Sequence, residues 1–266
     1  MLQQLAYEVV GTGPVLVSVH GTSSTPAQTW GPALGQLAKS HTLVLPYLPG
    51  SGSSPLPQGP IHPVVLAEQI ADVVSRAGYT RFAIAGASTG APIAIKVASL
   101  FPDRVSHLIS VCGYSSARPS LRLRLELWAS LLDAGPQAVG RLLLTLGMND
   151  RVAAMMPPEM LDEMVLAIGS NLQPGTPDQL AFAQTVDVEA ELDSITTPTL
   201  VITGLRDNFI DPAHSAHIAG RIPGAELLQF DGGHGVTSDC TNAVVEAINN
   251  FIGPSRPVKE SKLADS

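Results

Sequence analysis

The chain has 266 residues, enough for one large domain with a deep apolar core or at most two small ones. Apolar residues make up 45% and charged residues 14%, with 23 acidic against 15 basic side chains, which excludes a disordered chain. The net charge of -8 argues against binding of nucleic acid, because contacts with phosphates require a clustered basic face. Apolar runs stay well short of the ~20 residues of a membrane span, and the start lacks signal-peptide features. We therefore expect a cytoplasmic protein.

The first predicted elements form a β-hairpin. Two β-type runs, Ala6–Val10 and Val15–Val19, flank the turn-forming segment Gly11-Thr12-Gly13-Pro14, which favours antiparallel pairing. The later strands are mostly continuous apolar runs, typical of parallel strands buried on both faces. They are predicted at His41–Leu45, Arg81–Ala85, Val105–Val111, Pro198–Thr203 and Ala225–Phe230.

Helix-type stretches separate these strands. They are predicted at Thr29–Lys39, Pro63–Ala77, Thr89–Phe101, Ala213–Arg221 and Thr241–Phe251. Alternation of strand and helix predicts an α/β fold with a doubly wound, mostly parallel sheet. In such a sheet the active site lies at the carboxyl ends of the strands, so functional residues should directly follow strands.

The alternation stops between residues 113 and 195. This stretch contains no convincing strand, and four helices are predicted, at Ser120–Leu132, Pro136–Leu146, Pro158–Ile168 and Asp178–Thr185. We therefore expect an inserted all-helical cap over one end of the sheet. Residues 1–112 and 196–253 would form the core, and residues 254–266 a flexible tail.

The predicted cap holds five of the six methionines, which are Met148, Met155, Met156, Met160 and Met164. Methionine fills irregular gaps between helices, and it also forms pliable apolar walls against ligands. Both interpretations stay open. If the second holds, Met148, Met155, Met156 and Met160 are the candidate substrate-binding residues.

Ser88 is the candidate nucleophile. It stands in Gly86-Ala87-Ser88-Thr89-Gly90, between a predicted strand and a predicted helix, where the chain has to turn sharply. Glycine on both sides lets backbone segments approach closely, and the amino end of a helix favours negative charge. A serine that only caps a helix would need neither glycine, so the pattern favours a nucleophile.

A serine hydroxyl reacts only when a base takes its proton and a carboxylate orients that base. Of the seven histidines, His234 lies in a glycine-rich loop after the last predicted strand. Asp207 follows the preceding strand, so the chain order is Ser88, Asp207, His234. Asp211 is a rival acid, but the pair Asp211-Pro212 is typical of the start of a helix.

The segment His20-Gly21-Thr22 ends the Val15–Val19 strand and could reach the same crevice. The backbone N–H groups of Thr22 and Thr89 are the candidate oxyanion donors, each typically contributing ~3–4 kcal/mol to lowering the barrier. His20 is interpreted as a structural hydrogen-bonding residue. Cys112 is expected to pack as a small apolar residue.

With these four motifs in this order, the chain resembles the α/β-hydrolase fold superfamily from about Tyr7 to Ile252. Further similar segments are Leu48–Ser54, Phe101–Val105 and Leu192–Val201. The resemblance implies a nucleophile at Ser88, a base at His234 and an orienting acid at Asp207. It implies oxyanion donors at Thr22 and Thr89.

The chain also departs from the pattern of this superfamily. Ala87 and Thr89 stand where histidine and a large residue are frequent, and Tyr47 stands near a frequent aspartate. These positions bear on the shape of the substrate pocket and not on the triad. Basic residues of the predicted cap either form a solvated face or recognise a carboxylate or phosphate of the substrate. They are Arg118, Arg122, Arg124, Arg141 and Arg151.

The predicted function is a serine hydrolase that cleaves a medium-sized apolar carboxylic ester or thioester through an acyl-enzyme. The alternatives are a non-hydrolytic enzyme of the same fold (acyl transferase, cyclase, lyase or cofactor-free oxygenase) and a non-catalytic ligand-binding relative. No cofactor and no metal are expected, since the sequence contains neither a dinucleotide-binding fingerprint nor metal-ligand spacing. The expected partner is a small-molecule acyl substrate, and the chain could be a monomer or a homodimer.

Overall fold

The computed structural model describes residues 2–253; the predicted tail, 254–266, lies outside the described residues. Seven strands form one sheet in the order β1-β3-β2-β4-β5-β6-β7, and only β1 is antiparallel to its neighbour. The α/β class and the mostly parallel sheet are thus confirmed. The strands are β1 Tyr7–Val10, β2 Val15–Val19, β3 Thr42–Pro46, β4 Phe82–Ala87, β5 Val105–Val111, β6 Thr199–Gly204 and β7 Glu226–Phe230.

The predicted hairpin between the first two strands is wrong. Strand β1 pairs with β3, with Tyr7 opposite Pro46 and Val10 opposite Leu43, while β2 lies between β3 and β4. Burial explains the difference. Strand β2 is almost wholly buried and needs a neighbour on each side, whereas β1 is largely exposed and fits the edge of the sheet.

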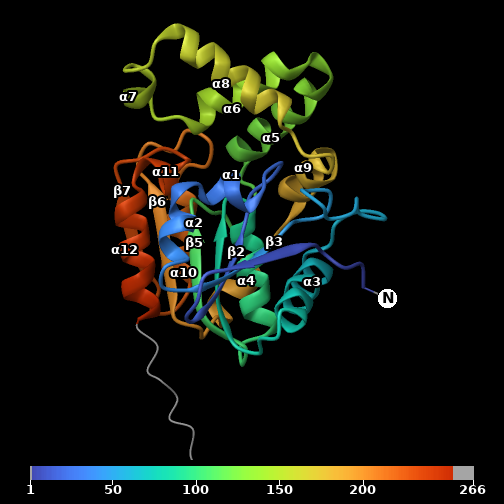
Figure 1. Ribbon diagram of the computed structural model, residues 1–266, viewed down its shortest axis with the longest axis vertical. Coiled ribbons are helices and arrows are strands. Elements are labelled where there is room, and N and C mark those ends of the chain that lie inside the picture. The colour runs from blue at the N-terminus through green and yellow to red at the C-terminus, as the bar shows by residue number, and fades with distance from the viewer. Residues whose placement is uncertain (1, 254–266) are drawn as a thin grey trace, which may run out of the picture.

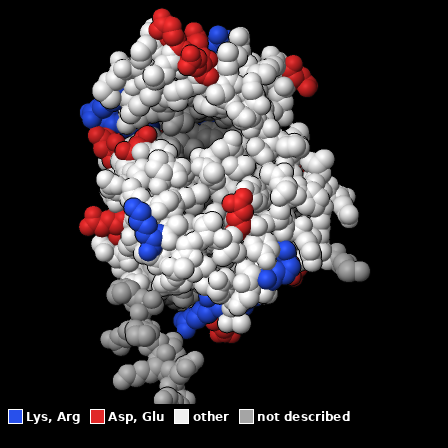
Figure 2. Space-filling view, viewed as in Figure 1, with Lys and Arg blue, Asp and Glu red and all other residues white. Residues whose placement is uncertain are grey.

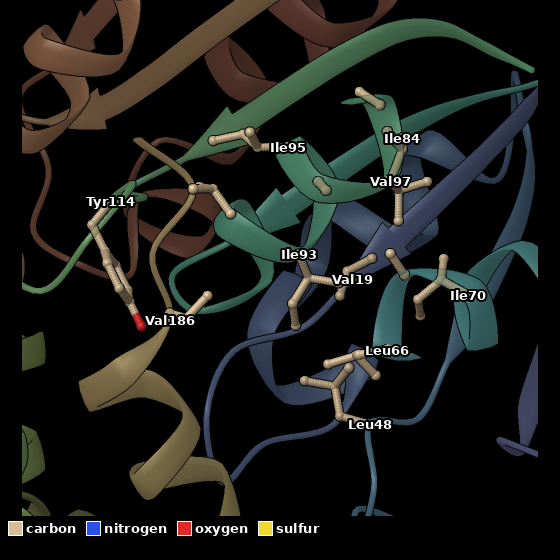
Figure 3. Close-up of a cluster of buried hydrophobic side chains, with 14 of the residues drawn as sticks. Val19, Leu48, Leu66, Ile70, Ile84, Ile93, Ile95, Val97, Tyr114 and Val186 are labelled. Atoms are coloured by element: carbon tan, nitrogen blue, oxygen red, sulfur yellow. The ribbon is translucent and has the colours of Figure 1, made fainter. Parts of the chain in front are cut away.

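Helices cover both faces of the sheet (Figure 1). One face packs against α3 (Pro63–Arg76), α4 (Gly90–Leu100) and α10 (Pro212–Arg221). Figure 3 shows side chains of this layer, with Val19 of the sheet near Ile93 and Ile84 of the sheet near Val97. The other face packs against α2 (Pro32–Leu37) and α12 (Thr241–Ile252).

Most predicted helices are present to within a few residues, but the one at Thr29–Lys39 is divided. Gly31 has a φ of +49° and Pro32 follows it, so α1 (Pro26–Trp30) ends there and α2 begins. A further short helix, α11 (Val236–Asp239), precedes α12. Among the helices of residues 2–253, none combines the length and apolarity needed to cross a membrane.

Between β5 and β6 the chain forms a helical segment, the insert. Its helices are α5 Pro119–Leu131, α6 Pro136–Gly147, α7 Asp150–Ala153, α8 Pro158–Ser170 and α9 Thr176–Thr185, with the 3-10 helices η1 Leu132–Ala134 and η2 Glu189–Ser194. Figure 1 shows α6, α7 and α8 farthest from the sheet, with α5 and α9 closer to it. Helices α6 and α8 approach closely at Gly140. A Cβ there would lie only 1.9 Å from the carbonyl oxygen of Val165. The two ends of the insert meet where Ser116 bridges Asp187.

Candidate active site

Ser88 sits on a sharp turn between β4 and α4. Its φ of +55° lies in the left-handed region, which side-chain-bearing residues rarely adopt. The flanking glycines make the turn possible. A Cβ on Gly86 would lie 2.0 Å from the carbonyl oxygen of Gly90, and one on Gly90 would lie 2.6 Å from that of Val19. The sequence pattern therefore has a steric basis in backbone packing.

Three side chains that are distant in the sequence meet at this turn. Ser88 Oγ lies 3.1 Å from Nε2 of His234, and Nδ1 of His234 lies 2.8 Å from Oδ2 of Asp207. A carboxylate only accepts hydrogen bonds, so Nδ1 carries the imidazole proton and Nε2 is free to accept from the serine. This is the geometry that the predicted roles of nucleophile, base and orienting acid require, and the roles themselves remain a prediction.

Asp207 is held in place by the chain that follows it. Its side chain is completely buried, and Oδ1 accepts the N–H groups of Phe209 and Ile210 at 2.9 and 2.8 Å. The Phe209 ring also packs edge-on against the imidazole of His234, with centroids 5.1 Å apart. Asp211 instead caps α10, accepting the N–H two residues further on. Asp207, not Asp211, therefore faces the histidine.

The loop after β2 lies directly against Ser88. A Cβ on Gly21 would come within 3.1 Å of Cβ of Ser88, so this close approach favours glycine. The hydroxyl oxygens of Thr22 and Thr89 are 2.7 Å apart. Both candidate oxyanion residues thus lie beside Ser88, and their role in binding an oxyanion remains a prediction.

His20 holds this loop through hydrogen bonds of both ring nitrogens. Its Nδ1–H donates to the carbonyl oxygen of Gly21 at 2.8 Å, and its Nε2 accepts the N–H of Leu48 at 3.0 Å. Complete burial lowers the pKa of His20 to about 4, partly offset by the bond to Gly21. A neutral imidazole satisfied on both nitrogens is a structural residue, consistent with the interpretation from sequence.

Cys112, Asp207 and His234 form a cluster whose ligand atoms lie within 4.8 Å of one another. Such a set could in principle hold a metal ion. The residues fit one poorly, because Asp207 and His234 are paired with each other and a thiol must lose its proton to bind metal. Burial, and secondly the charge of Asp207, raise the pKa of Cys112 well above its usual value. Cys112 therefore stays a protonated, buried packing residue, as expected.

A cavity of about 530 Å³ opens at Ser88 and His234, between the core and the insert. Figure 2 shows a hollow on this face with uncharged walls. The apolar part of its lining is Ala87, Val111, Cys112, Trp128, Leu143, Ala167, Ile168, Leu172 and Phe209; the polar part includes Ser23, Ser24, Gln28, Thr29, Asn171 and Thr237. Among the described residues that line it, none is lysine, arginine, aspartate or glutamate.

The structure does not bring the four candidate methionines to this cavity. None of them is among the described lining residues; Met155 is 78% exposed and Met160 47% exposed. Met148 and Met156 are half-buried. Likewise, the lining contains none of the five arginines of the insert; Arg151, for example, pairs with Asp231.

The insert contributes different residues to the cavity. Leu143 and Gly147 come from α6, Ala167 and Ile168 come from α8, and Leu172 lies just after α8. Leu143 and Gly147 are four residues apart, so they lie on the same face of α6. The face of a predicted helix is thus the signal that could have identified Leu143, in place of the local density of methionine.

Residues 14–238 match the family described as the alpha/beta hydrolase fold. The chain belongs to this family. Pyrrolizixenacetamide deacetylase of Xenorhabdus hominickii is 25% identical over 233 residues, covering 87% of this chain and 88% of that protein. Among solved structures, a thermophilic esterase from Thermogutta terrifontis aligns with a TM-score of 0.80 and 23% identity, covering 93% and 92% of the two chains.

An enol-lactonase from Burkholderia xenovorans shares the fold of this α/β hydrolase with a TM-score of 0.80 and 19% identity. The alignment covers 93% of this chain and 95% of the lactonase. The two structural likenesses concern the fold alone. The hydrolase family accounts for the order of the Ser88, Asp207 and His234 loops along the chain.

Proposed function

We propose that this protein is a serine hydrolase that cleaves a medium-sized, apolar and uncharged carboxylic ester or thioester through an acyl-enzyme. The observation that carries the proposal is the continuous hydrogen-bonded line from Ser88 through His234 to the buried Asp207, with distances of 3.1 and 2.8 Å. Membership of the hydrolase family supports it, as does a relative named deacetylase.

The reaction begins with attack of Ser88 Oγ on the carbonyl carbon while Nε2 of His234 takes the hydroxyl proton. The carbonyl oxygen becomes an oxyanion and is held by the N–H groups of Thr22 and Thr89. Collapse of this intermediate breaks the acyl bond, and the imidazolium of His234 gives its proton to the leaving group. Asp207 stabilises the imidazolium without taking the proton. Water, activated by His234, then attacks the acyl-enzyme and releases the acid and free Ser88.

The cavity wall supports the substrate class. The insert and Phe209 supply apolar side chains for an acyl group, and about 530 Å³ is within the size range of pockets for small organic ligands. A substrate carboxylate or phosphate would lose hydration on entering and would meet no cationic lining residue in the described part of the chain. We therefore assign no role in substrate recognition to the five arginines of the insert.

The test combines labelling with turnover. A fluorophosphonate should label wild-type protein and not Ser88→Ala, and p-nitrophenyl esters of increasing chain length should be hydrolysed in a Ser88-dependent manner. Label on another residue, or equal turnover by Ser88→Ala, would refute the nucleophile. Labelling of Ser88 without hydrolysis of any ester or thioester would favour the non-hydrolytic enzyme.

A matched pair of esters tests whether the enzyme prefers an uncharged acyl group. p-Nitrophenyl hexanoate and the mono-p-nitrophenyl ester of adipic acid have acyl chains of equal carbon number and differ by one terminal carboxylate. We expect kcat/KM for the charged ester to be lower by at least about tenfold, because the carboxylate must be desolvated without a partner. Equal values would contradict the uncharged substrate class and leave the acyl-transfer chemistry intact.

A further inference from the structure

A line of hydroxyl groups joins the two candidate oxyanion residues to the helical insert. Thr22 Oγ1 lies 2.7 Å from Thr89 Oγ1, and Thr89 Oγ1 lies 3.3 Å from the hydroxyl oxygen of Tyr114. The Tyr114 hydroxyl in turn donates to the carbonyl oxygen of Ala183 at 3.0 Å. Thr89, Tyr114 and Ala183 are all buried, and Thr22 is half-buried. The line therefore runs from the loop beside Ser88 to helix α9.

The protons on this line can be assigned. A phenol has one proton, and that of Tyr114 goes to the carbonyl oxygen of Ala183, which has none to give. The oxygen of Tyr114 can then only accept, so Thr89 donates to it, and Thr22 donates to Thr89. Burial raises the pKa of Tyr114 above its usual value, which keeps the phenol protonated at neutral pH. The direction of every hydrogen bond on the line is thus fixed.

Helix α9 also contacts the loop after β2, which carries Thr22, at a second place. The N–H of Ser23 donates to Oε1 of Gln179 at 2.7 Å, and the hydroxyls of Ser23 and Thr176 lie 2.6 Å apart. Ser23 has a φ of +53°, so the loop turns sharply at the residue that follows Thr22. These contacts fix the backbone next to one candidate donor, whereas the hydroxyl line links that donor to the other.

We propose that Thr22, Thr89 and Tyr114 are positioning residues for the oxyanion hole. Their side-chain hydroxyls fix the separation of the N–H groups of Thr22 and Thr89. Through Tyr114 they also fix the position of these groups relative to helix α9 of the insert. Figure 3 shows Tyr114 with its hydroxyl directed toward the segment that carries Val186, immediately after α9. This inference rests on the proposed function, because it presumes an oxyanion held by these two N–H groups.

The physical reason is that an oxyanion hole acts through preorganisation. A donor stabilises the transition state only when it already points to where the negative charge develops. The N–H of Thr89 is part of the rigid turn that starts α4, but the N–H of Thr22 belongs to a loop from another strand. The bond between the two hydroxyls is the direct side-chain link between these segments. Its loss should impair the transition state more than binding of the ground state.

The test measures kcat and KM for a p-nitrophenyl ester that the wild type hydrolyses. Thr22→Val keeps the shape of the side chain and removes its hydroxyl, whereas Thr22→Ser keeps the hydroxyl. For Thr22→Val we expect kcat to fall by about 10- to 100-fold, part of the effect of a complete oxyanion donor, with KM within about threefold of wild type. Thr22→Ser should recover kcat to within about threefold of wild type.

Tyr114→Phe tests the far end of the line. Its kcat should fall by about tenfold, and the double variant with Thr22→Val should lose little more than the more impaired single variant, because the hydroxyls act as a unit. Thr199→Val is the matched control. It removes a buried threonine hydroxyl that donates to the carbonyl oxygen of Thr197 at the opposite end of β6, so it should lower the melting temperature and leave kcat unchanged.

Four results separate the possible failures. A kcat within twofold of wild type in Thr22→Val would overturn the inference, as would a loss confined to KM or to thermal stability. A kcat of Thr199→Val that falls as far as that of Thr22→Val would also overturn it, because the effect would then be general destabilisation. If the wild type shows no turnover that depends on Ser88, the proposed function fails and this inference fails with it.

Discussion

Asp207→Asn is the substitution for which the structure gives the most specific expectation. Oδ1 of Asp207 accepts two backbone N–H groups, those of Phe209 and Ile210, and Oδ2 accepts from His234. Asparagine has a single acceptor oxygen, which should stay with the two backbone donors. Its NH2 group then faces Nδ1 of His234, and that nitrogen has to give up its proton to accept a bond. The proton moves to Nε2, which can no longer accept from Ser88.

The magnitude follows from the change of tautomer. In a serine protease with the same triad chemistry, this substitution reduces kcat by about 10⁴-fold, equivalent to about 5.5 kcal/mol of transition-state stabilisation. We expect a similar loss here, because both backbone bonds to Asp207 enforce the unfavourable orientation of the amide. KM should change little, since Asp207 is absent from the described lining of the cavity.

The assay is steady-state hydrolysis of a p-nitrophenyl ester at pH 7.5, with circular dichroism to verify the fold. Asp211→Asn is the matched control, because asparagine also caps a helix and the residue lies only four positions away. This control should retain wild-type kcat. If Asp207→Asn kept more than a tenth of the wild-type kcat, or if Asp211→Asn lost most of it, the assignment of the acid would be wrong.

Three further predictions concern the turn, the charge state of buried histidines and the cavity wall. Gly86→Ala places a Cβ 2.0 Å from a backbone oxygen and should lower both Tm and kcat, whereas Gly220→Ala, on an exposed helical position with open space, should raise stability by about 0.5–1 kcal/mol in urea denaturation. Burial lowers the pKa of His214 to about 4, so the unfolded chain binds more protons between pH 6.5 and 4. The free energy of unfolding should therefore decrease as the pH is lowered from 6.5 to 4, by up to about 1.4 kcal/mol per pH unit for this residue. The decrease should be shallower in His214→Leu. Leu172→Ala should change the preferred acyl chain length in the ester series, whereas Met155→Gln, at a position 78% exposed, should not; the reverse result would restore the methionine interpretation.

The local pattern of the sequence was sufficient for the fold class and for the order of the site residues. Continuous apolar strands alternate with amphipathic helices, and this alternation by itself predicts a parallel sheet. Ser88, Asp207 and His234 each follow a strand, and strand ends of one sheet share an edge. Their proximity could therefore be inferred across 146 residues of sequence separation between Ser88 and His234.

The pairing of β1 and the walls of the cavity could not be inferred in the same way. A turn-forming segment after Val10 suggested a hairpin, but the need to bury both sides of β2 placed β3 between the two strands. Similarly, methionine density says nothing about which face of a helix is covered. The tertiary arrangement of the insert decided that Leu143 and Ile168 line the cavity while Met155, which follows α7, is exposed.

What the sequence determined by itself is the chemistry that each loop can offer, because residue type and the adjoining strand or helix are local properties. What only the tertiary structure decided is which groups from different loops are within bonding distance, such as the hydroxyls of Thr22, Thr89 and Tyr114. Such contacts depend on the packing of the whole chain to within an ångström. No local pattern encodes a distance of that kind.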